Sequence, residues 1–233
     1  MMRLDKMLAH SGYGSRKEVK EYIRKGYVMV NGEVVCDDDF KVDEINDEII
    51  IANMNVNYEK MIYFMLNKPD GYVSATYDPN EPIVLDLIDG YHNRGLFPVG
   101  RLDKDTVGLL LITNDGKLAH RMLAPKSHVE KKYYLKYDGV VPSYINNIFN
   151  EGVVLDDGYK CMPAKFIDLG NNEAYIIIKE GKYHQVKRMM NSVGCEVTYL
   201  KRVEFGPIQL DETLNEGEYR PLTKEELDLI INI

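Results

Sequence analysis

The chain has 233 residues, of which 45% are hydrophobic and 28% are charged, a composition typical of folded globular proteins that excludes a disordered chain. Its three cysteines show no Cys-x-x-Cys spacing, and no apolar run approaches the ~20 residues of a membrane helix, which argues against a disulfide framework, a zinc site and a membrane protein. The net charge of −8 disfavours a polyanionic partner only if charge is spread evenly, and we expect a cytoplasmic location.

The first 35 residues predict two helices followed by a β-hairpin. Apolar residues recur at helical spacing over residues 4–8. Ser15 followed by Glu18 forms a capping box, which predicts that a second helix begins there. The dipeptide Asn31-Gly32 tolerates the positive φ angles of a type I′ turn. The order helix, helix, hairpin describes a small module with its own core.

The second predicted helix has an apolar side and a basic side. At 100° per residue, Val19, Tyr22 and Ile23 fall together. The adjacent side, which we call the basic stripe, consists of Arg16, Lys17, Lys20 and Arg24. Charge alone leaves two interpretations open, a solvated helix face and an RNA-binding surface. The acidic segment, residues 37–48, would repel RNA, so we expect it to face away from any RNA-binding groove.

Residues 2–50 resemble the S4 domain, the small RNA-binding module of ribosomal protein S4 and of several RNA-modifying enzymes. The capping Ser, the basic residues and the Val-Asn-Gly hairpin occur together and in the order of that domain. The resemblance implies that the second helix and the hairpin hold the RNA backbone. It points to five RNA-binding residues: Arg3, Arg16, Lys17, Lys20 and Arg24. A polar, irregular stretch at 53–60 predicts a linker after this domain.

From residue 61 onward the chain predicts alternating short strands, turns and helices. Asp103 lies in a polar loop directly before the apolar stretch 109–113, which predicts a buried strand. A loop carboxylate anchored on a buried strand keeps its geometry, which suits catalysis. An arbitrary Asp in such a loop more often pairs with a neighbour such as Arg101 or Lys104, or caps a turn.

The run Gly-Arg-Leu-Asp-x-x-Thr-x-Gly-Leu-Leu at 100–110 resembles the signature of the RsuA family of pseudouridine synthases, in which this Asp is essential. Residues 130–135 place Tyr133 at the family's second motif, where the aromatic ring stacks on the target base. Residues 180–189 match the third motif, whose basic residue, Lys187, pairs with the Asp. The resemblance covers nearly the whole chain and implies that Asp103, Tyr133 and Lys187 are catalytic. Asp105 occupies a variable position and is interpreted as structural.

The resemblance implies isomerisation of a uridine in RNA, which requires no cofactor and no metal. An ionised Asp can attack the sugar or the uracil ring, or promote departure of uracil, and the sequence leaves these routes open. The target nucleotide must leave the base stack. Tyr133 would then stack on the base, and Arg101 would fill the vacated space. Two further RNA contacts are expected near the pocket, at Lys131 and Arg188.

The third motif, Tyr-His-Gln-Val-Lys-Arg-Met at 183–189, is closer to family members that act on 16S rRNA than to those that act on large-subunit RNA. We therefore predict that the protein modifies uridine 516 of 16S rRNA. We also expect it to be a monomer that acts on a small-subunit assembly intermediate. The alternatives are a 23S rRNA synthase, a non-catalytic ribosome-assembly factor and a hydrolase using two carboxylates. The expected fold is α+β: an S4-like domain at 1–52, a linker at 53–60, and a catalytic domain at 61–233 with a mixed, mainly antiparallel sheet and flanking helices.

Overall fold

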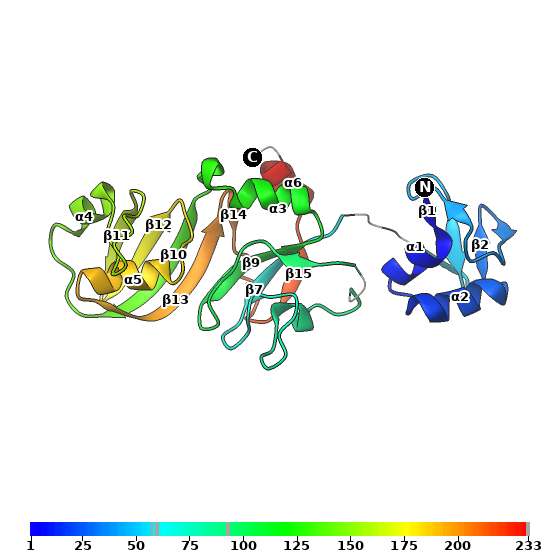
Figure 1. Ribbon diagram of the computed structural model, residues 1–233, viewed down its shortest axis with the longest axis horizontal. Helices are drawn as coiled ribbons and strands as arrows, with labels where there is room; N and C mark the ends of the chain where they lie inside the picture. The colour runs from blue at the N-terminus through cyan, green and yellow to red at the C-terminus, as the bar shows by residue number, and fades with distance from the viewer. Residues whose placement is uncertain (57, 59–60, 92–93, 232–233) are drawn as a thin grey trace. The chain divides into compact units, whose positions relative to one another are not determined.

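The computed structural model describes residues 1–56, 58, 61–91 and 94–231. The chain divides into two compact units (Figure 1). The N-terminal unit comprises Met1–Ile62 and Ile88–Leu96, and the second unit comprises Tyr63–Leu87 and Phe97–Ile233. Helices long and apolar enough to cross a membrane are absent from the part of the chain that the structure describes.

The N-terminal unit packs α1 (Leu4–His10) and α2 (Arg16–Arg24) against small antiparallel sheets. Among its described residues, one sheet has the strand order β3-β2-β5-β6, and β1 pairs with β4. These strands are β1 (Met2–Arg3), β2 (Val28–Val30), β3 (Glu33–Val34), β4 (Lys41–Val42), β5 (Ile49–Ile51) and β6 (Met54–Asn55). Apolar side chains of both helices and of β2 and β5 form one core.

Local signals place α2 and the hairpin as predicted. The Ser15 Oγ accepts a hydrogen bond from the Glu18 backbone at 3.3 Å, and the Glu18 carboxylate accepts one from the Ser15 backbone at 2.7 Å, which confirms the capping box. Asn31 and Gly32 have φ angles of 52° and 83° between β2 and β3, which confirms the turn. Tyr22 is 40% exposed, so its assignment to the packing side was wrong; only the centre of that side reaches the core.

The N-terminal unit extends beyond the expected domain boundary. Met54 and Asn55, within the stretch expected as a linker, form β6 on the edge of β5. Positions 57, 59 and 60 of that stretch lie outside the described residues. The segment Ile88–Leu96 also belongs to this unit, since the Arg94 guanidinium donates to the His10 carbonyl at 2.8 Å and lies 5.0 Å from the Tyr58 ring centroid.

The second unit is built on a mixed sheet with the strand order β11-β12-β10-β13-β9-β7-β15, to which β8 and β14 attach at β9 and β13. Only β13 and β9 pair in parallel in this sheet as described, which confirms the expected mixed, mainly antiparallel α+β fold. The strands are β7 (Tyr63–Lys68), β8 (Phe97–Pro98), β9 (Val107–Thr113), β10 (Lys131–Asp138), β11 (Lys165–Gly170), β12 (Glu173–Ile178), β13 (Glu196–Phe205), β14 (Ile208–Gln209) and β15 (Tyr219–Pro221).

Helices pack around this sheet: α3 contacts α6, α4 contacts β11, and α5 contacts β13 (Figure 1). Their bounds are α3 (Gly116–Leu123), α4 (Ile145–Glu151), α5 (Gln185–Ser192) and α6 (Lys224–Ile231), with short 3-10 turns η1 (Val84–Leu87) and η2 (Pro125–Ser127). Asp115 caps α3, since its Oδ1 accepts from the backbone of Lys117 and Leu118 at 3.0 and 3.1 Å. The apolar sides of α3 and α6 share one core with β7 and β9.

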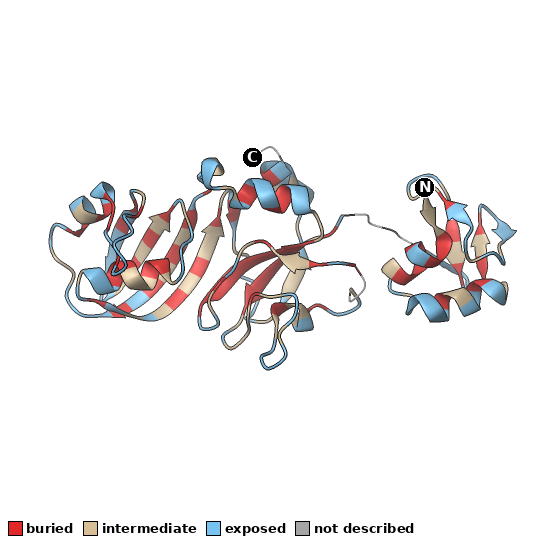
Figure 2. Cartoon of the chain, viewed as in Figure 1, coloured by how far each residue is buried: buried red, intermediate tan, exposed pale blue. Residues whose placement is uncertain are grey.

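The strand β9 runs through the core, and each of its residues is buried (Figure 2). Gly108 is essential to its pairing. Its φ angle is 98°, and a Cβ at this position would overlap the backbone oxygen of Arg202. Glycine therefore lets β9 approach β13 closely, and the loop before β9 is held next to the middle of the sheet.

Candidate active site

The loop between β8 and β9, which carries Asp103, is tied down by a buried ammonium group. Lys68, at the end of β7, is fully buried. Its Nζ donates to three backbone carbonyls, those of Pro69 at 2.9 Å, Lys104 at 3.0 Å and Thr106 at 2.9 Å. Burial lowers the pKa of Lys68 to about 8, against the opposing effect of nearby carboxylates. The ammonium therefore fixes the backbone on the C-terminal side of Asp103.

A buried hydroxyl group fixes the other side of the same residue. The Ser74 Oγ donates to the Leu102 carbonyl at 2.9 Å and accepts from the Leu102 backbone N–H at 3.0 Å. The Thr106 N–H donates to the Asp103 carbonyl at 3.0 Å. Since both neighbours of Asp103 are held through their backbones, its side chain is free to face a cavity from a rigid support.

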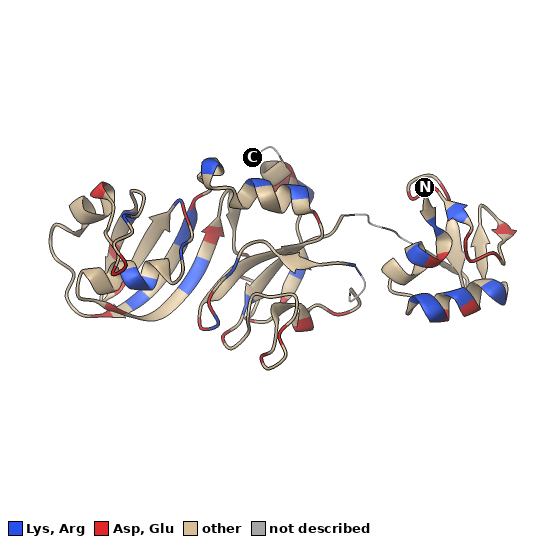
Figure 3. Cartoon of the chain, in the orientation of Figure 1, with Lys and Arg blue, Asp and Glu red and all other residues tan. Residues whose placement is uncertain are grey.

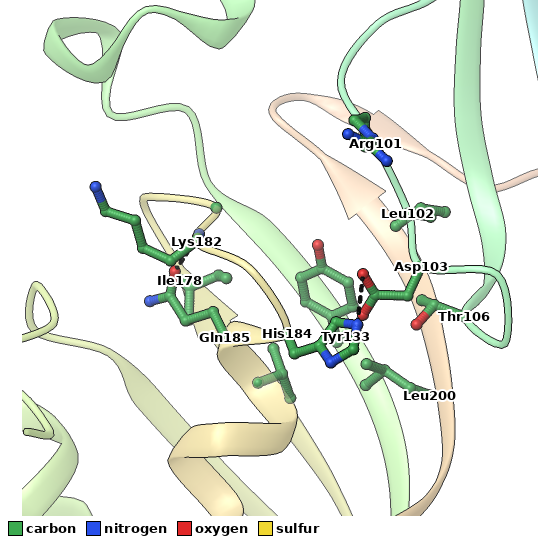
Figure 4. Close-up of a pocket in the computed structure, with 12 residues that line it drawn as sticks. Arg101, Leu102, Asp103, Thr106, Tyr133, Ile178, Lys182, His184, Gln185 and Leu200 are labelled. Carbon is green, nitrogen blue, oxygen red and sulfur yellow. Dashed lines mark hydrogen bonds and ion pairs between the residues drawn. The ribbon is translucent and has the colours of Figure 1, made fainter. Parts of the chain in front are cut away.

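Asp103 and Tyr133 line one cavity in the second unit (Figure 4). The Asp103 side chain is 29% exposed. Tyr133, on β10, is 8% exposed, and its ring lines the same cavity as the Asp103 carboxylate (Figure 4). Arg101 is exposed and lines the same cavity. A carboxylate beside an aromatic ring at a partly open cavity can bind a planar base and act on the atoms at its edge.

Lys187 stands between two carboxylates. Its Nζ is 3.9 Å from Asp103 Oδ2 and 2.5 Å from Asp105 Oδ1. Burial acts to raise the pKa of Asp105, but the hydrogen bond and charge of Lys187 outweigh it and hold that pKa below its usual range. Asp105, interpreted as structural from the sequence, is thus the nearer partner of Lys187. Asp103 lies farther from the Lys187 ammonium group and interacts with it more weakly.

His184 is a residue of this site that the sequence interpretation missed. Its Nε2 is 3.6 Å from Asp103 Oδ1 (Figure 4). A φ angle of 48° before α5 turns the residue toward the cavity, and its ring stacks on Tyr183 with centroids 3.8 Å apart. The signal was present within the third motif, where His184 stands three positions before Lys187. The two oxygens of the Asp103 carboxylate therefore face two different groups, the His184 imidazole and the Lys187 ammonium group.

Two of the predicted RNA contacts, Lys131 and Arg188, lie outside the set of residues that line the Asp103 cavity. Lys131 is buried and lies two residues before Tyr133 on β10, so its side chain is on the same face of the sheet. Arg188 lies on α5, where its Nε is 2.6 Å from Asp156 Oδ1 and its Nη2 is 2.8 Å from Asp157 Oδ2. The residues that line the Asp103 cavity include neither of these two.

Lys and Arg recur along α2 (Figure 3), and the basic stripe there is organised around one buried carboxylate, that of Asp5. Asp5 is fully buried and accepts from Arg3 Nε at 3.0 Å and from Arg16 Nη2 at 2.9 Å, with Lys20 Nζ at 3.7 Å. Burial acts to raise the pKa of Asp5, but the hydrogen bonds from Arg3 and Arg16 outweigh it and lower that pKa. Lys17 is exposed and forms no ion pair among the described residues.

The acidic segment partly covers the basic stripe. Asp38 Oδ2 is 3.1 Å from Lys20 Nζ and 3.0 Å from Arg24 Nη2, and Asp39 contacts Arg3. The expectation that this segment faces away was wrong for these two residues. Opposite charges attract at this range, and the short path from β3 to β4 brings the carboxylates back to α2.

The chain is similar to known proteins over both units. The RNA pseudouridylate synthase family model matches residues 62–192, and the S4 domain model matches residues 2–49. The chain is 48% identical to the uncharacterized RNA pseudouridine synthase YtzG of Bacillus subtilis (strain 168), over 98% of each chain. It is 40% identical to ribosomal small subunit pseudouridine synthase A of Escherichia coli (strain K12), over 99% of this chain and 100% of that one.

Two further likenesses bear on the RNA target and on the fold. The chain is 38% identical to ribosomal large subunit pseudouridine synthase B of Bacillus subtilis (strain 168), over 97% of this chain and 94% of that one. A solved structure described as a crystal structure of pseudouridylate synthase superposes with a TM-score of 0.70 and 37% identity, over 99% of this chain and 100% of that one. The likeness therefore extends to both sequence and fold.

Proposed function

Because the chain belongs to the RsuA family of RNA pseudouridine synthases and carries an N-terminal S4 domain, we propose that it converts uridine 516 of 16S rRNA to pseudouridine with Asp103 as the catalytic carboxylate. The enzyme is a pseudouridine synthase that acts on ribosomal RNA. Its reaction breaks the bond between ribose C1′ and uracil N1 and forms one between C1′ and C5. The hydrogen on C5 leaves to solvent, and N1 gains a proton.

The position of the Asp103 carboxylate is the observation that supports this assignment. The carboxylate lines a cavity together with the Tyr133 ring. It is carried by a loop whose backbone carbonyls accept hydrogen bonds from Lys68 and Ser74. An ionised Asp is required whether it attacks the sugar, attacks the uracil ring or promotes departure of uracil. Lys187 Nζ and His184 Nε2 lie 3.9 and 3.6 Å from the two oxygens of this carboxylate.

The remaining cavity residues fit the handling of an extruded nucleotide. Removing a base from a helix costs a few kcal/mol, and stacking on Tyr133 returns roughly 1–3 kcal/mol of it. Arg101 is exposed two residues before Asp103 and can occupy the space that the base leaves. The S4 domain supplies the phosphate contacts that do not depend on sequence, through Arg3 and the basic stripe.

Release of tritium from RNA labelled at uracil C5 tests the catalytic assignment. Asp103→Asn keeps the shape of the side chain and removes its charge, so release should fall on the order of 10³-fold or more. Asp105→Asn, in the same loop, is the matched control and should keep most of the activity. Release that survives Asp103→Asn would rule out this carboxylate as the catalytic group.

The RNA target is the finer part of the proposal. The relatives include a small-subunit enzyme at 40% identity and a large-subunit enzyme at 38%, and the third motif is what favours 16S rRNA. The 38% identity to the large-subunit enzyme makes 23S rRNA the second candidate. Pseudouridine should be mapped in both RNAs from cells that lack the gene and from cells that express the wild type or Asp103→Asn. A site missing from 23S rRNA alone would contradict the 16S assignment.

We also propose that the enzyme acts in the cytoplasm as a monomer on a partly assembled small subunit. Base flipping requires an accessible uridine, and a partly assembled particle holds the surrounding RNA in its folded form before the complete subunit covers the site. Tritium release should be faster on an assembly intermediate than on protein-free 16S rRNA, and light scattering should give the mass of one chain, 26.8 kDa. Equal rates on both substrates would contradict the need for an intermediate.

A further inference from the structure

A second cavity adjoins the Asp103 cavity and shares Tyr133 with it. Among the charged residues that line it, cations strongly outnumber acids, although the whole chain has a net charge of −8. They are Arg101, Lys131, Lys179, Lys182 and Arg202, with the single carboxylate of Glu180. Such an excess on one cavity concentrates positive potential where the wall excludes water.

Arg202 is the innermost of these cations. It lies on β13 directly opposite Tyr133 of β10, and it is 2% exposed. Its Nε donates to the Leu109 carbonyl at 2.8 Å, and its guanidinium lies 4.7 Å from the Phe205 ring centroid. Its Nη2 is buried and has no hydrogen-bond partner among the described residues. A buried charged donor without a partner is costly, and native proteins rarely retain one without a use.

Lys131 places a second buried charge next to the first. It is 9% exposed, its Nζ donates to the Val129 carbonyl at 2.8 Å, and it lies 5.5 Å from the same Phe205 ring. Burial, together with the charge of Arg202, lowers the pKa of Lys131 to about 8. Two like charges side by side under one cavity raise each other's energy, and an anion between them and solvent would relieve both.

The protein's own carboxylates do not supply that anion. Within the described residues, neither Lys131 nor Arg202 forms an ion pair with an acid. Glu180 is already engaged, since its carboxylate accepts from the Met162 backbone at 2.8 Å, from Gln185 Nε2 at 2.9 Å and from the Tyr159 hydroxyl at 2.7 Å. Arg202 makes a side-chain hydrogen bond with Tyr133, and Glu180 acts on Lys131 through its charge without forming an ion pair with it. Neither cation therefore has a carboxylate in contact, and an anionic ligand could supply the negative charge.

We propose that this second cavity is an oxyanion site and that it holds one backbone phosphate adjoining the extruded uridine. The identity of the ligand rests on the proposed function, whereas anion binding itself does not. A nucleotide whose base lies against Tyr133 carries a phosphate on each side of its sugar, and the adjoining cavity begins at the same ring. A phosphodiester supplies the charge and the acceptor oxygens that Lys131 and Arg202 lack.

Sulfate, a tetrahedral dianion, tests the site without RNA. Thermal unfolding of the full chain is followed in sulfate and in chloride at matched ionic strength, for wild type, Lys131→Met and Lys136→Met. Lys136 is the matched control because it is on the same strand with a side chain 53% exposed. Sulfate stabilises folded proteins in general, so the difference between variants is the readout. Stabilisation should be smaller in Lys131→Met alone; equal stabilisation of all three proteins would overturn the site.

A second arm distinguishes an RNA phosphate from a free anion. In an Asp103→Asn background, binding is measured to RNAs in which a neutral methylphosphonate replaces one phosphate at a time around the target uridine. One position should cost the Lys131-containing protein about tenfold or more in affinity and cost Lys131→Met nothing further. The slope of log affinity against log salt should also fall by about 0.7–0.9 in Lys131→Met.

The outcomes separate this inference from the proposed function. A sulfate effect with every methylphosphonate acting equally on both proteins would contradict the phosphodiester and leave a free-anion site. Failure of the wild type to release tritium from any ribosomal RNA would contradict the proposed function, while the sulfate result would stand by itself.

Discussion

Lys187 illustrates how one ammonium group can serve two carboxylates. Asp105 holds it at 2.5 Å and is 67% exposed, whereas Asp103 is 3.9 Å away and 29% exposed. The contact with the more exposed partner is weakened by solvent, so it contributes little to stability. Under the proposed function its consequence lies in catalysis, because Lys187 places a positive charge 3.9 Å from Asp103.

Substitution of Lys187 tests that division. Lys187→Met should lower kcat on the order of 10²-fold through loss of charge beside Asp103, with RNA affinity within about twofold of wild type. Asp105→Asn releases Lys187 toward Asp103 and should leave kcat nearly unchanged. Single-turnover tritium release and filter binding measure the two quantities. Equal losses of kcat in both variants would instead make the Lys187–Asp105 pair the functional unit.

The charge state of Lys131 should make anion binding depend on pH. Its pKa of about 8 means that the ammonium form required for binding is lost as pH rises through that value. Sulfate does not titrate in this range, so its affinity should fall roughly tenfold between about pH 7 and about pH 9. Lys131→Arg, which stays charged, should abolish the fall. Calorimetry on both proteins checks this, and a flat profile for wild type would contradict it.

At the scale of elements, the connection between β3 and β4 contacts α2, where the proposed function places RNA. Asp38 faces both Lys20 and Arg24 across this contact. Lys20 and Arg24 keep 32% and 63% of their side chains exposed in these pairs. Ion pairs that solvent reaches contribute ~1 kcal/mol or less, so a phosphate backbone can displace them. Under the proposed function, these acidic residues compete with RNA for α2 without preventing RNA from binding.

Asp38→Asn should strengthen RNA binding by removing this competitor. We expect an increase of roughly three- to tenfold at low salt, which diminishes as added salt screens the charges. Glu48→Gln, also within the acidic segment, has no ion pair among the described residues and serves as the control. Filter binding over a salt series measures both. Unchanged affinity in Asp38→Asn would show that the contact opens freely without RNA.

At the scale of the whole molecule, the proposed RNA-binding surface and the proposed catalytic cavity reside in separate units. The basic stripe belongs to the N-terminal unit, and the Asp103 cavity belongs to the second unit. Each unit has its own apolar core. Substitutions in the basic stripe, which would contact RNA phosphates, should therefore leave the geometry around Asp103 unchanged.

Neutralising the stripe should accordingly raise KM and spare kcat. Lys17→Gln with Arg24→Gln is the suitable pair, because Arg16 and Lys20 also neutralise the buried Asp5 and their loss would destabilise the unit. KM should rise about tenfold from two lost phosphate contacts, and kcat should stay within about twofold. Steady-state tritium release gives both constants, and a matching fall in kcat would show that the units are coupled.

Features that depend on near neighbours were determined by the sequence alone. The capping box of Ser15 and Glu18, the turn at Asn31-Gly32 and the buried strand before Asn114 were all predicted. Each arises from hydrogen bonds or periodicity within a few residues, so local spacing contains the necessary information. The family motifs likewise identified the RsuA family and the α+β fold.

Contacts between distant segments were decided only by the tertiary structure. Spacing could not show that Lys187 is nearer to Asp105 than to Asp103, that His184 faces Asp103, or that Asp38 lies on α2. Nor could it place Arg202 opposite Tyr133, since strand register joins residues far apart in the chain. Coulomb energy depends on distances in space, and those distances exist only after the sheet has formed.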